Sequence, residues 1–184
     1  PDHPMTFTHL PFDHPLYIMY SSGTTGLPKS IVHSSGGTLI QHLKELRLHC
    51  DLTPEDTIFY FTTCGWMMWN WLVSGLAVGA TLVLFDGNPF YPNAEMLLTM
   101  ADELDITIFG TSAKYIATLK DVGVAPKTLS SFPKLKLITS TGSALADESF
   151  DYVYEEWKSD VLLASISGGT DIISCFVLGS PTLG

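Results

Sequence analysis

The sequence predicts an α/β fold in which a mostly parallel sheet is covered by helices on both faces. Segments of helical and strand character alternate along most of the chain, and the strand segments are apolar throughout rather than every second residue. Such strands are typical of a sheet buried on both faces. Gly142, Gly168 and Gly169 directly follow predicted strands, at the positions where open α/β sheets bind their ligands.

The N-terminal third is predicted to contain a surface segment, then strands and a helix. Residues 1–14 hold three prolines and three histidines, which indicates a linker or surface segment. The apolar run 15–20 predicts a buried strand. In order, the further expected elements are a polar loop at 21–29, a short returning strand at 30–33, a helix at 38–48, a turn at 53–56 and a strand at 57–62.

The rest of the chain repeats a unit in which a helix leads to a strand. The expected helices cover 67–77, 94–104, 112–120 and 147–157, and the strands that follow them cover 81–85, 106–109, 135–140 and 161–166. Because helical crossovers join parallel strands, this alternation favours one parallel sheet.

The composition argues for a folded, acidic protein and against some partners. The 184 residues are 46% apolar and only 15% charged, with a net charge of −10. That charge argues against a nucleic-acid groove and against binding to an anionic membrane surface. The sole arginine is Arg47. Since phosphate clamps usually contain arginine, part of any nucleotide clamp is expected to lie elsewhere.

Cysteine usage and chain ends suggest an internal piece of a cytosolic protein. The three cysteines form no CxxC pair, which predicts neither a disulfide framework nor a zinc site. The longest apolar stretch, 66–84, is interrupted by polar residues and glycines, so a buried helix and strand explain it better than a membrane span. No signal peptide is visible, and we interpret both ends as cut from a longer chain.

The strongest local motif is the loop Tyr20-Ser-Ser-Gly-Thr-Thr-Gly-Leu-Pro-Lys29. Its glycines allow close approach of the backbone to an oxygen cluster, its amides and hydroxyls can donate to phosphate oxygens, and its lysine adds positive charge. It is not a Walker A loop, since the glycine spacing differs and Pro28 precedes the lysine. A polar β-hairpin loop is the alternative for a generic sequence of this composition.

This string resembles the phosphate-binding loop of the adenylate-forming superfamily, which includes acyl-CoA synthetases, luciferases and nonribosomal adenylation domains. The resemblance implies that residues 15–184 are part of an AMP-binding (adenylation) domain. It further implies that the loop wraps the β- and γ-phosphates of ATP while a carboxylate attacks the α-phosphate. The implied loop contacts are Ser21, Ser22, Gly23, Thr24, Thr25, Gly26 and Lys29.

Two later segments fit the superfamily pattern in the right order. The first, after strand 135–140, would contact adenine and ribose through Gly142, Ser143 and Ala144. In the second, Ser167-Gly168-Gly169-Thr170-Asp171, Ser167, Gly168 and Gly169 would contact the nucleotide, Thr170 the α-phosphate, and Asp171 would hold Mg2+. Thr170, Asp171 and Lys29 are thus the implied catalytic residues. Ser167 stands where the family has an aromatic residue, and Asp171 where it has Glu; taken alone, each segment is also an ordinary turn.

An aromatic segment suggests the acyl pocket. Gly65-Trp-Met-Met-Trp-Asn-Trp71 is similar to the Gly-Trp segment that lines the acyl site in acetyl-CoA synthetases, although plain core packing also explains it. Those enzymes carry a bulky tryptophan where this chain has Gly168, so the resemblance implies room for a longer acyl group. The expected pocket residues are Trp66, Met67, Met68, Trp69, Thr141 and Gly168.

Taken together, residues 15–178 look like the acetoacetyl-CoA synthetase branch of the superfamily. That resemblance implies the reaction acetoacetate + ATP + CoA → acetoacetyl-CoA + AMP + PPi through an acyl-adenylate, in the cytosol. It also implies that the mobile C-terminal domain, with its adenylation lysine, lies outside this chain, which would then be inactive alone. Two alternatives stay open: another short- or medium-chain acyl-CoA synthetase, or a non-catalytic truncated α/β module. The oligomeric state is not predicted.

Overall fold

A five-stranded parallel sheet forms the centre of the molecule in the computed structural model, which describes residues 3–21 and 26–182. Its strands are β3 (Thr57–Tyr60), β4 (Thr81–Val83), β5 (Ile108–Ser112), β6 (Leu137–Thr141) and β7 (Leu162–Ser165). They lie in the order β4-β3-β5-β6-β7, and every neighbouring pair is parallel. The chain adds β4 on one side of β3 and the later strands on the other, as in doubly wound sheets.

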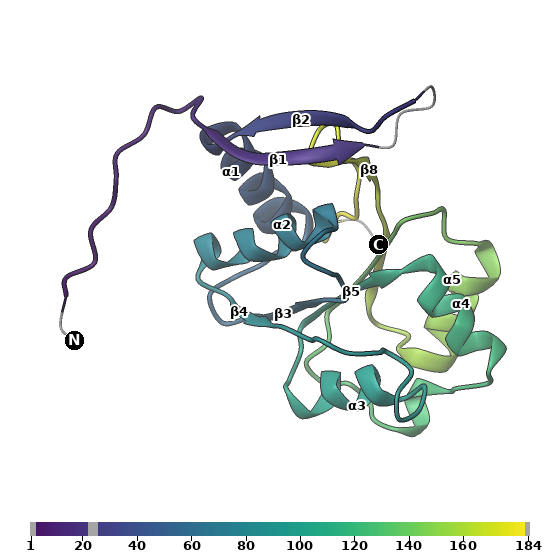
Figure 1. The fold of residues 1–184 in the computed structure, drawn as a ribbon. Helices are drawn as coiled ribbons and strands as arrows, with labels where there is room; N and C mark the ends of the chain where they lie inside the picture. Colours follow the sequence, from purple (N-terminus) through teal and green to yellow (C-terminus); the bar gives the residue numbers. More distant parts are fainter. Residues whose placement is uncertain (1–2, 22–25, 183–184) are drawn as a thin grey trace.

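Helices cover both faces of this sheet (Figure 1), which confirms the predicted fold class. One face packs against α2 (Met67–Val73), the short helix η2 (Ser74–Val78) and the π-helical turn η1 (Glu45–His49), which continues α1 (Ser35–Lys44). The other face packs against α3 (Met96–Glu103), α4 (Ala113–Asp121), α5 (Asp147–Tyr152) and η4 (Val153–Trp157), with η3 (Pro126–Thr128) in the connection before β6.

Two hydrophobic cores result because successive side chains of a strand point to opposite faces. In β3, Ile58 and Tyr60 belong to the core beneath α2, whereas Phe59 belongs to the core of α3, α4 and α5. All three are at most 2% exposed. A strand that is buried on both faces needs consecutive apolar residues, which explains why the pattern in the sequence is continuous.

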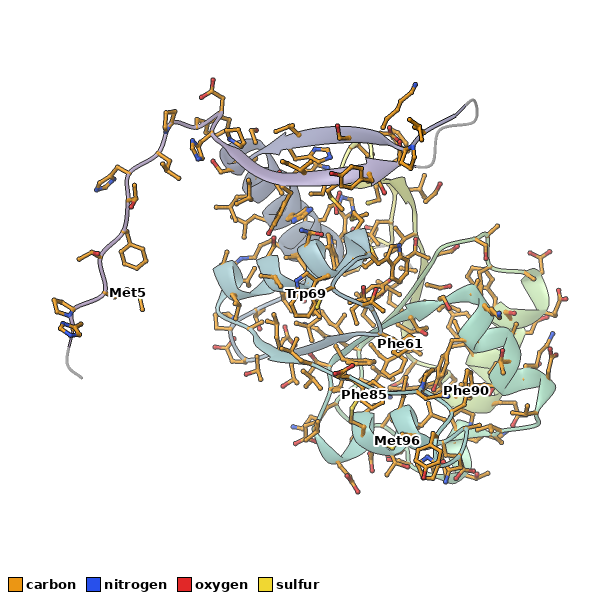
Figure 2. All side chains as sticks on the ribbon, in the orientation of Figure 1. Met5, Phe61, Trp69, Phe85, Phe90 and Met96 are labelled. Carbon is orange, nitrogen blue, oxygen red and sulfur yellow. The ribbon has the colours of Figure 1, made fainter. Side chains whose placement is uncertain are left out.

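An antiparallel hairpin of β1 (Pro15–Ser21) and β2 (Lys29–Ser34) lies against α1 rather than in the sheet (Figure 1). The prediction of a buried strand at 15–20 is therefore wrong in its burial: Ile18 and Tyr20 are 63% and 66% exposed, and in β1 only Met19 is buried. A two-stranded ribbon that packs against a single helix buries only the face toward that helix, so the side chains on its other face stay exposed. Residues 3–11 have no regular structure and are exposed, and Figure 2 shows Met5 on this extended segment, away from the sheet.

The hairpin of β8 (Ser167–Gly169) and β9 (Ser174–Val177) was not expected, because its first strand is too short and glycine-rich to show a strand pattern. The expected helix 38–48 begins three residues earlier, and the expected helices 67–77 and 147–157 end as 3-10 and π-helical turns. Strand ends also differ by one to three residues, since pairing with neighbouring strands decides where a strand stops. Among the described residues, no helix combines the length and apolar character needed to cross a membrane.

Candidate functional site

A cavity of about 370 Å3 opens at the carboxyl ends of β6 and β7. Three parts of the chain supply most of its wall: the start of α2, the turn after β6, and the segment between β7 and the β8–β9 hairpin. The lining residues are Glu45, Trp66, Met67, Met68, Trp71, Thr141, Gly142, Ser143, Ala144, Ser165, Ile166, Ser167, Gly168, Gly169, Thr170, Ser174, Cys175 and Leu178. Parallel strands bring these segments together because their carboxyl ends meet at one edge of the sheet.

Most of the residues expected from the sequence to bind adenosine, the α-phosphate and the acyl group line this cavity. From the first two segments these are Trp66, Met67, Met68, Thr141, Gly142, Ser143 and Ala144; from the third they are Ser167, Gly168, Gly169 and Thr170. The ring of Trp66 lies edge-on to Tyr60, with centroids 6.0 Å apart. Tyr60 is itself anchored by the hydrogen bond that its hydroxyl donates to the carbonyl of Thr111.

Trp69 does not belong to the cavity wall. It lies on α2 (Figure 2) and is half-buried, whereas Met68 and Trp71 of the same helix are buried. Trp71, which was not among the pocket residues predicted from the sequence, lines the cavity and is fully buried. Trp71 lies four residues after Met67 and three after Met68, and this helical spacing is the signal that could have selected it.

Gly142 meets the geometric expectation for a close approach. Its φ is +94°, a left-handed conformation that favours glycine, and a Cβ built on it would have no neighbour within 4 Å. Open space therefore lies directly beside the backbone at the cavity rim, where a flat group can be accommodated.

Gly168 is glycine for a different reason from the one expected. A Cβ at this position would collide with the carbonyl oxygen of Ser174 and would lie 2.7 Å from the Cα of Cys175. The missing side chain thus permits close pairing of β8 with β9. The expectation that this glycine simply enlarges the acyl pocket is not supported, because the side chain would point at the backbone of the neighbouring strand.

The turn after β8 carries Thr170 and Asp171. Thr170 is half-buried, and its carbonyl accepts a hydrogen bond of 2.9 Å from Nε2 of His33. Asp171 is exposed and lies outside the cavity wall, although its Oδ2 is 4.0 Å from the position of a Cβ on Gly169. Within 3–21 and 26–182, no three metal-ligating side chains gather. A single accessible carboxylate still fits Mg2+, which commonly takes one or two carboxylates and completes its shell with phosphate oxygens and water.

The glycine-rich loop is described only at its ends. The predicted residues Ser22, Gly23, Thr24 and Thr25 lie outside the described residues. Ser21 and Lys29 pair across the end of the β1–β2 hairpin, and Gly26 and Lys29 are exposed. None of these three lines the cavity.

Glu45 is a buried carboxylate at the cavity that the sequence analysis did not find. It is 1% exposed and accepts hydrogen bonds from Nε1 of Trp71 (2.9 Å), Nε2 of Gln41 (3.0 Å), the amide of Cys175 (3.2 Å) and the hydroxyl of Ser174. Burial acts to raise the pKa of Glu45, but the hydrogen bonds from Ser174, Cys175 and Trp71 outweigh it and hold the pKa below its usual value. No local motif could have revealed it, because its donors Trp71, Ser174 and Cys175 are distant in sequence.

Comparison with known proteins assigns the chain to a family. Residues 3–178 match the AMP-binding enzyme family, and the chain belongs to that family.

Individual members of the family are similar to this chain over nearly its whole length. An acetoacetyl-coenzyme A synthetase of Rhizobium meliloti (strain 1021) is 61% identical over 178 residues, 97% of this chain. A malonamoyl-CoA synthetase of Penicillium aethiopicum is 50% identical over 191 aligned residues, 96% of this chain. The solved acetoacetyl-CoA synthetase from Streptomyces lividans superimposes with a TM-score of 0.93 at 46% identity and covers all of this chain. The chain spans 27%, 26% and 29% of the lengths of these proteins.

Proposed function

We propose that this chain carries the ATP- and acyl-binding part of an acid–thiol ligase that converts acetoacetate, ATP and CoA to acetoacetyl-CoA, AMP and pyrophosphate. The supporting observation is the cavity, whose wall is built from three segments, each singled out independently by its sequence. The high identity to acetoacetyl-CoA synthetases over nearly the whole chain supports the same assignment. We further propose a cytosolic location, in line with three free cysteines.

In this proposal the nucleotide extends from the cavity toward the glycine-rich loop. Gly142, Ser143 and Ala144, together with Ser167, Gly168 and Gly169, border the adenosine. The hydroxyl of Thr170 donates to the α-phosphate, where the acyl carboxylate attacks and pyrophosphate leaves. Residues 21–26 and Lys29 bind the β- and γ-phosphates, and Asp171 holds Mg2+, which when bound neutralises phosphate charge. CoA thiolate then attacks the acyl carbon and releases AMP.

The acyl group is proposed to occupy the part of the cavity lined by Trp66, Met67, Met68 and Thr141. The names of the relatives indicate the substrate class: acetoacetyl and malonamoyl groups both carry a carbonyl on the third carbon. Malonamate is accordingly the second candidate acid. Both acids have a short chain that fits a cavity of this size.

The first test is ATP binding by the 184-residue chain, measured by calorimetry with Mg2+. We expect saturable binding that Lys29→Ala weakens, because the variant removes a positive charge from the phosphates. Lys134→Ala is the matched control, since Lys134 is an exposed lysine beyond the cavity wall. Equal affinity of all three proteins, or no binding, would contradict the assigned role of the loop.

The second test is turnover by the protein over its full natural length. We expect CoA-dependent AMP release with acetoacetate, less with malonamate, and little with acetate or butyrate, which lack the third-carbon carbonyl. The 184-residue chain should bind ATP without turnover, since the adenylation lysine is proposed to lie outside it. Faster AMP release with acetate or butyrate than with acetoacetate would contradict acetoacetate as the substrate.

A further inference from the structure

The structure points to a role for two buried side chains, Glu45 in the cavity wall and His42 one helical turn before it. We propose that both are positioning residues: they hold the turn that presents Thr170 and Asp171, whose backbone is strained at Ile173. This inference rests on the proposed function, because it concerns the same reacting atoms. Neither residue was singled out by a motif, and both act through the turn 170–175 rather than on the substrate.

Glu45 ties three elements together at one carboxylate. It lies at the junction of α1 and η1, Trp71 reaches it from α2, and Ser174 and Cys175 reach it from β9. Gln41, one helical turn earlier, donates to the Glu45 carboxylate and also to the Ser174 hydroxyl. The hydrogen bonds from these donors offset the free-energy cost of burying the charged carboxylate. If one donor moves away, the protein loses stability, because the buried charge is then incompletely hydrogen-bonded. The start of β9 is thereby fixed to the helix beneath the cavity.

His42 holds the residue just before β9. It is fully buried, and its Nε2 donates to the carbonyl of Ile173 at 2.7 Å, while its Nδ1 lies 2.8 Å from the hydroxyl of Ser74. Both ring nitrogens therefore have a polar partner, and the Ser74 hydroxyl beside Nδ1 also bonds the carbonyl of Asn70 at 3.1 Å. His33, on β2, adds a third side-chain contact to the same turn, at the carbonyl of Thr170.

The backbone of Ile173 has an unfavourable conformation, which indicates that surrounding contacts restrain the turn. Its φ is +47°, a left-handed conformation that is a genuine outlier for a β-branched residue, and its side chain is only 2% exposed. Such a conformation persists only where the surroundings over-determine it, and it is found most often at functional sites. His42 on its carbonyl and Glu45 on the next two residues supply that restraint.

The consequence for the reaction is geometric. Ser174 and Gly169 pair in the hairpin, and the amide of Ile173 donates to the carbonyl of Thr170. A shift of Ser174 therefore moves Thr170, which must lie within hydrogen-bond reach of the α-phosphate to act. Displacement of a positioned group by about 1 Å can reduce a rate by about 100-fold.

The test compares Glu45→Gln with Asp56→Asn in the full-length protein. Asp56 is the matched control because it is also a buried carboxylate, 6% exposed, held by Thr53 and Lys136 and absent from the cavity wall. Both variants should lower the melting temperature. Only Glu45→Gln should accelerate amide hydrogen exchange at Ile173 and Cys175, by about tenfold or more, and shift the indole 15N–H resonance of Trp71.

Kinetics separate positioning from stability. We expect Glu45→Gln to lower kcat for AMP formation by about 10- to 100-fold with a KM for ATP within about twofold of the wild type. Ser174→Ala removes the hydrogen bonds of that hydroxyl with Glu45 and Gln41 but no charge, so it should lower kcat in the same direction by less. Asp56→Asn should keep kcat near the wild-type value at temperatures well below its unfolding.

Each outcome decides the inference. If Glu45→Gln accelerates amide exchange at Ile173 and Cys175 but leaves kcat unchanged, the positioning role is refuted and Glu45 is a purely structural group. Exchange at the turn that responds equally to Asp56→Asn would overturn it as well. If the wild-type protein forms no acyl-adenylate with any acid, the proposed function fails, and the exchange and Trp71 measurements still show whether Glu45 restrains the turn.

Discussion

Gly168→Ala is the most informative single substitution, because two explanations of this glycine predict different results. If glycine serves only to enlarge the acyl pocket, a methyl group there narrows the pocket and favours smaller acids. In the structure, that methyl group points instead at β9: it would lie 2.7 Å from the Cα of Cys175 and closer still to the carbonyl oxygen of Ser174.

The magnitude follows from the required movement. Ordinary contact begins at 3.4 Å, so the Cα of Cys175 must retreat by at least about 0.7 Å. The amide of Cys175 donates to Glu45 at 3.2 Å, so a movement of β9 also disturbs that hydrogen bond. Overpacking of this kind costs about 1–3 kcal/mol. For a chain of this length, that lowers Tm by about 2–12 °C.

The assay is thermal unfolding beside Gly169→Ala, followed by turnover of the full-length variants. Gly169 is the adjacent control for stability: the nearest atom to a Cβ there is Oδ2 of Asp171, at 4.0 Å. We expect Gly168→Ala to unfold at the lower temperature and to lose turnover with every acid tested. Equal Tm values together with a switch of preference toward acetate would refute the packing argument.

Three further predictions use other parts of the molecule. Burial lowers the pKa of His42 from 6.5 despite its hydrogen bond to Ile173; because the unfolded chain then binds the proton more tightly, stability should fall as pH drops below about 6.5. Unfolding from pH 7.5 to 5 should show this slope, and His42→Gln should reduce it; an unchanged slope would exclude His42 as its source. Asp171→Asn should weaken ATP binding with Mg2+ but leave Tm within about 1 °C, since the side chain is exposed; unchanged affinity would remove the metal role. Leu98→Ala, in the fully buried core of α3, should cost about 2–5 kcal/mol in denaturant unfolding, against less than about 0.5 kcal/mol for exposed Leu76→Ala; similar costs would contradict the observed burial.

Much of the fold could be predicted from residue types and their local pattern in the sequence. The strands β3, β5, β6 and β7 were predicted from runs rich in apolar residues, because a strand covered on both faces does not alternate apolar and polar residues. The segments that begin at Trp66, Thr141 and Ser167 were found by motif, and they meet at one edge of the sheet because its strands are parallel.

Other features depend on contacts between residues far apart in the chain, and no local pattern encodes them. The exposure of Ile18 depends on what covers the β1–β2 hairpin, since the same apolar sequence can form a strand buried on one face or on both. The inner role of Trp71, and the outer position of Trp69, depend on which face of α2 meets the sheet.

Glu45 is the clearest case. In the sequence it is one acidic residue in an amphipathic helix, where a solvated surface position is the ordinary expectation. Its donors Trp71 and Ser174 lie 26 and 129 residues away, and only the packing of α2 and β9 against η1 brings them to it. Residue types and spacing thus specify the strands, the loop and the motif segments. Burial, charge pairing and the restraint on Ile173 arise only when the folded chain excludes water from groups that the sequence leaves far apart.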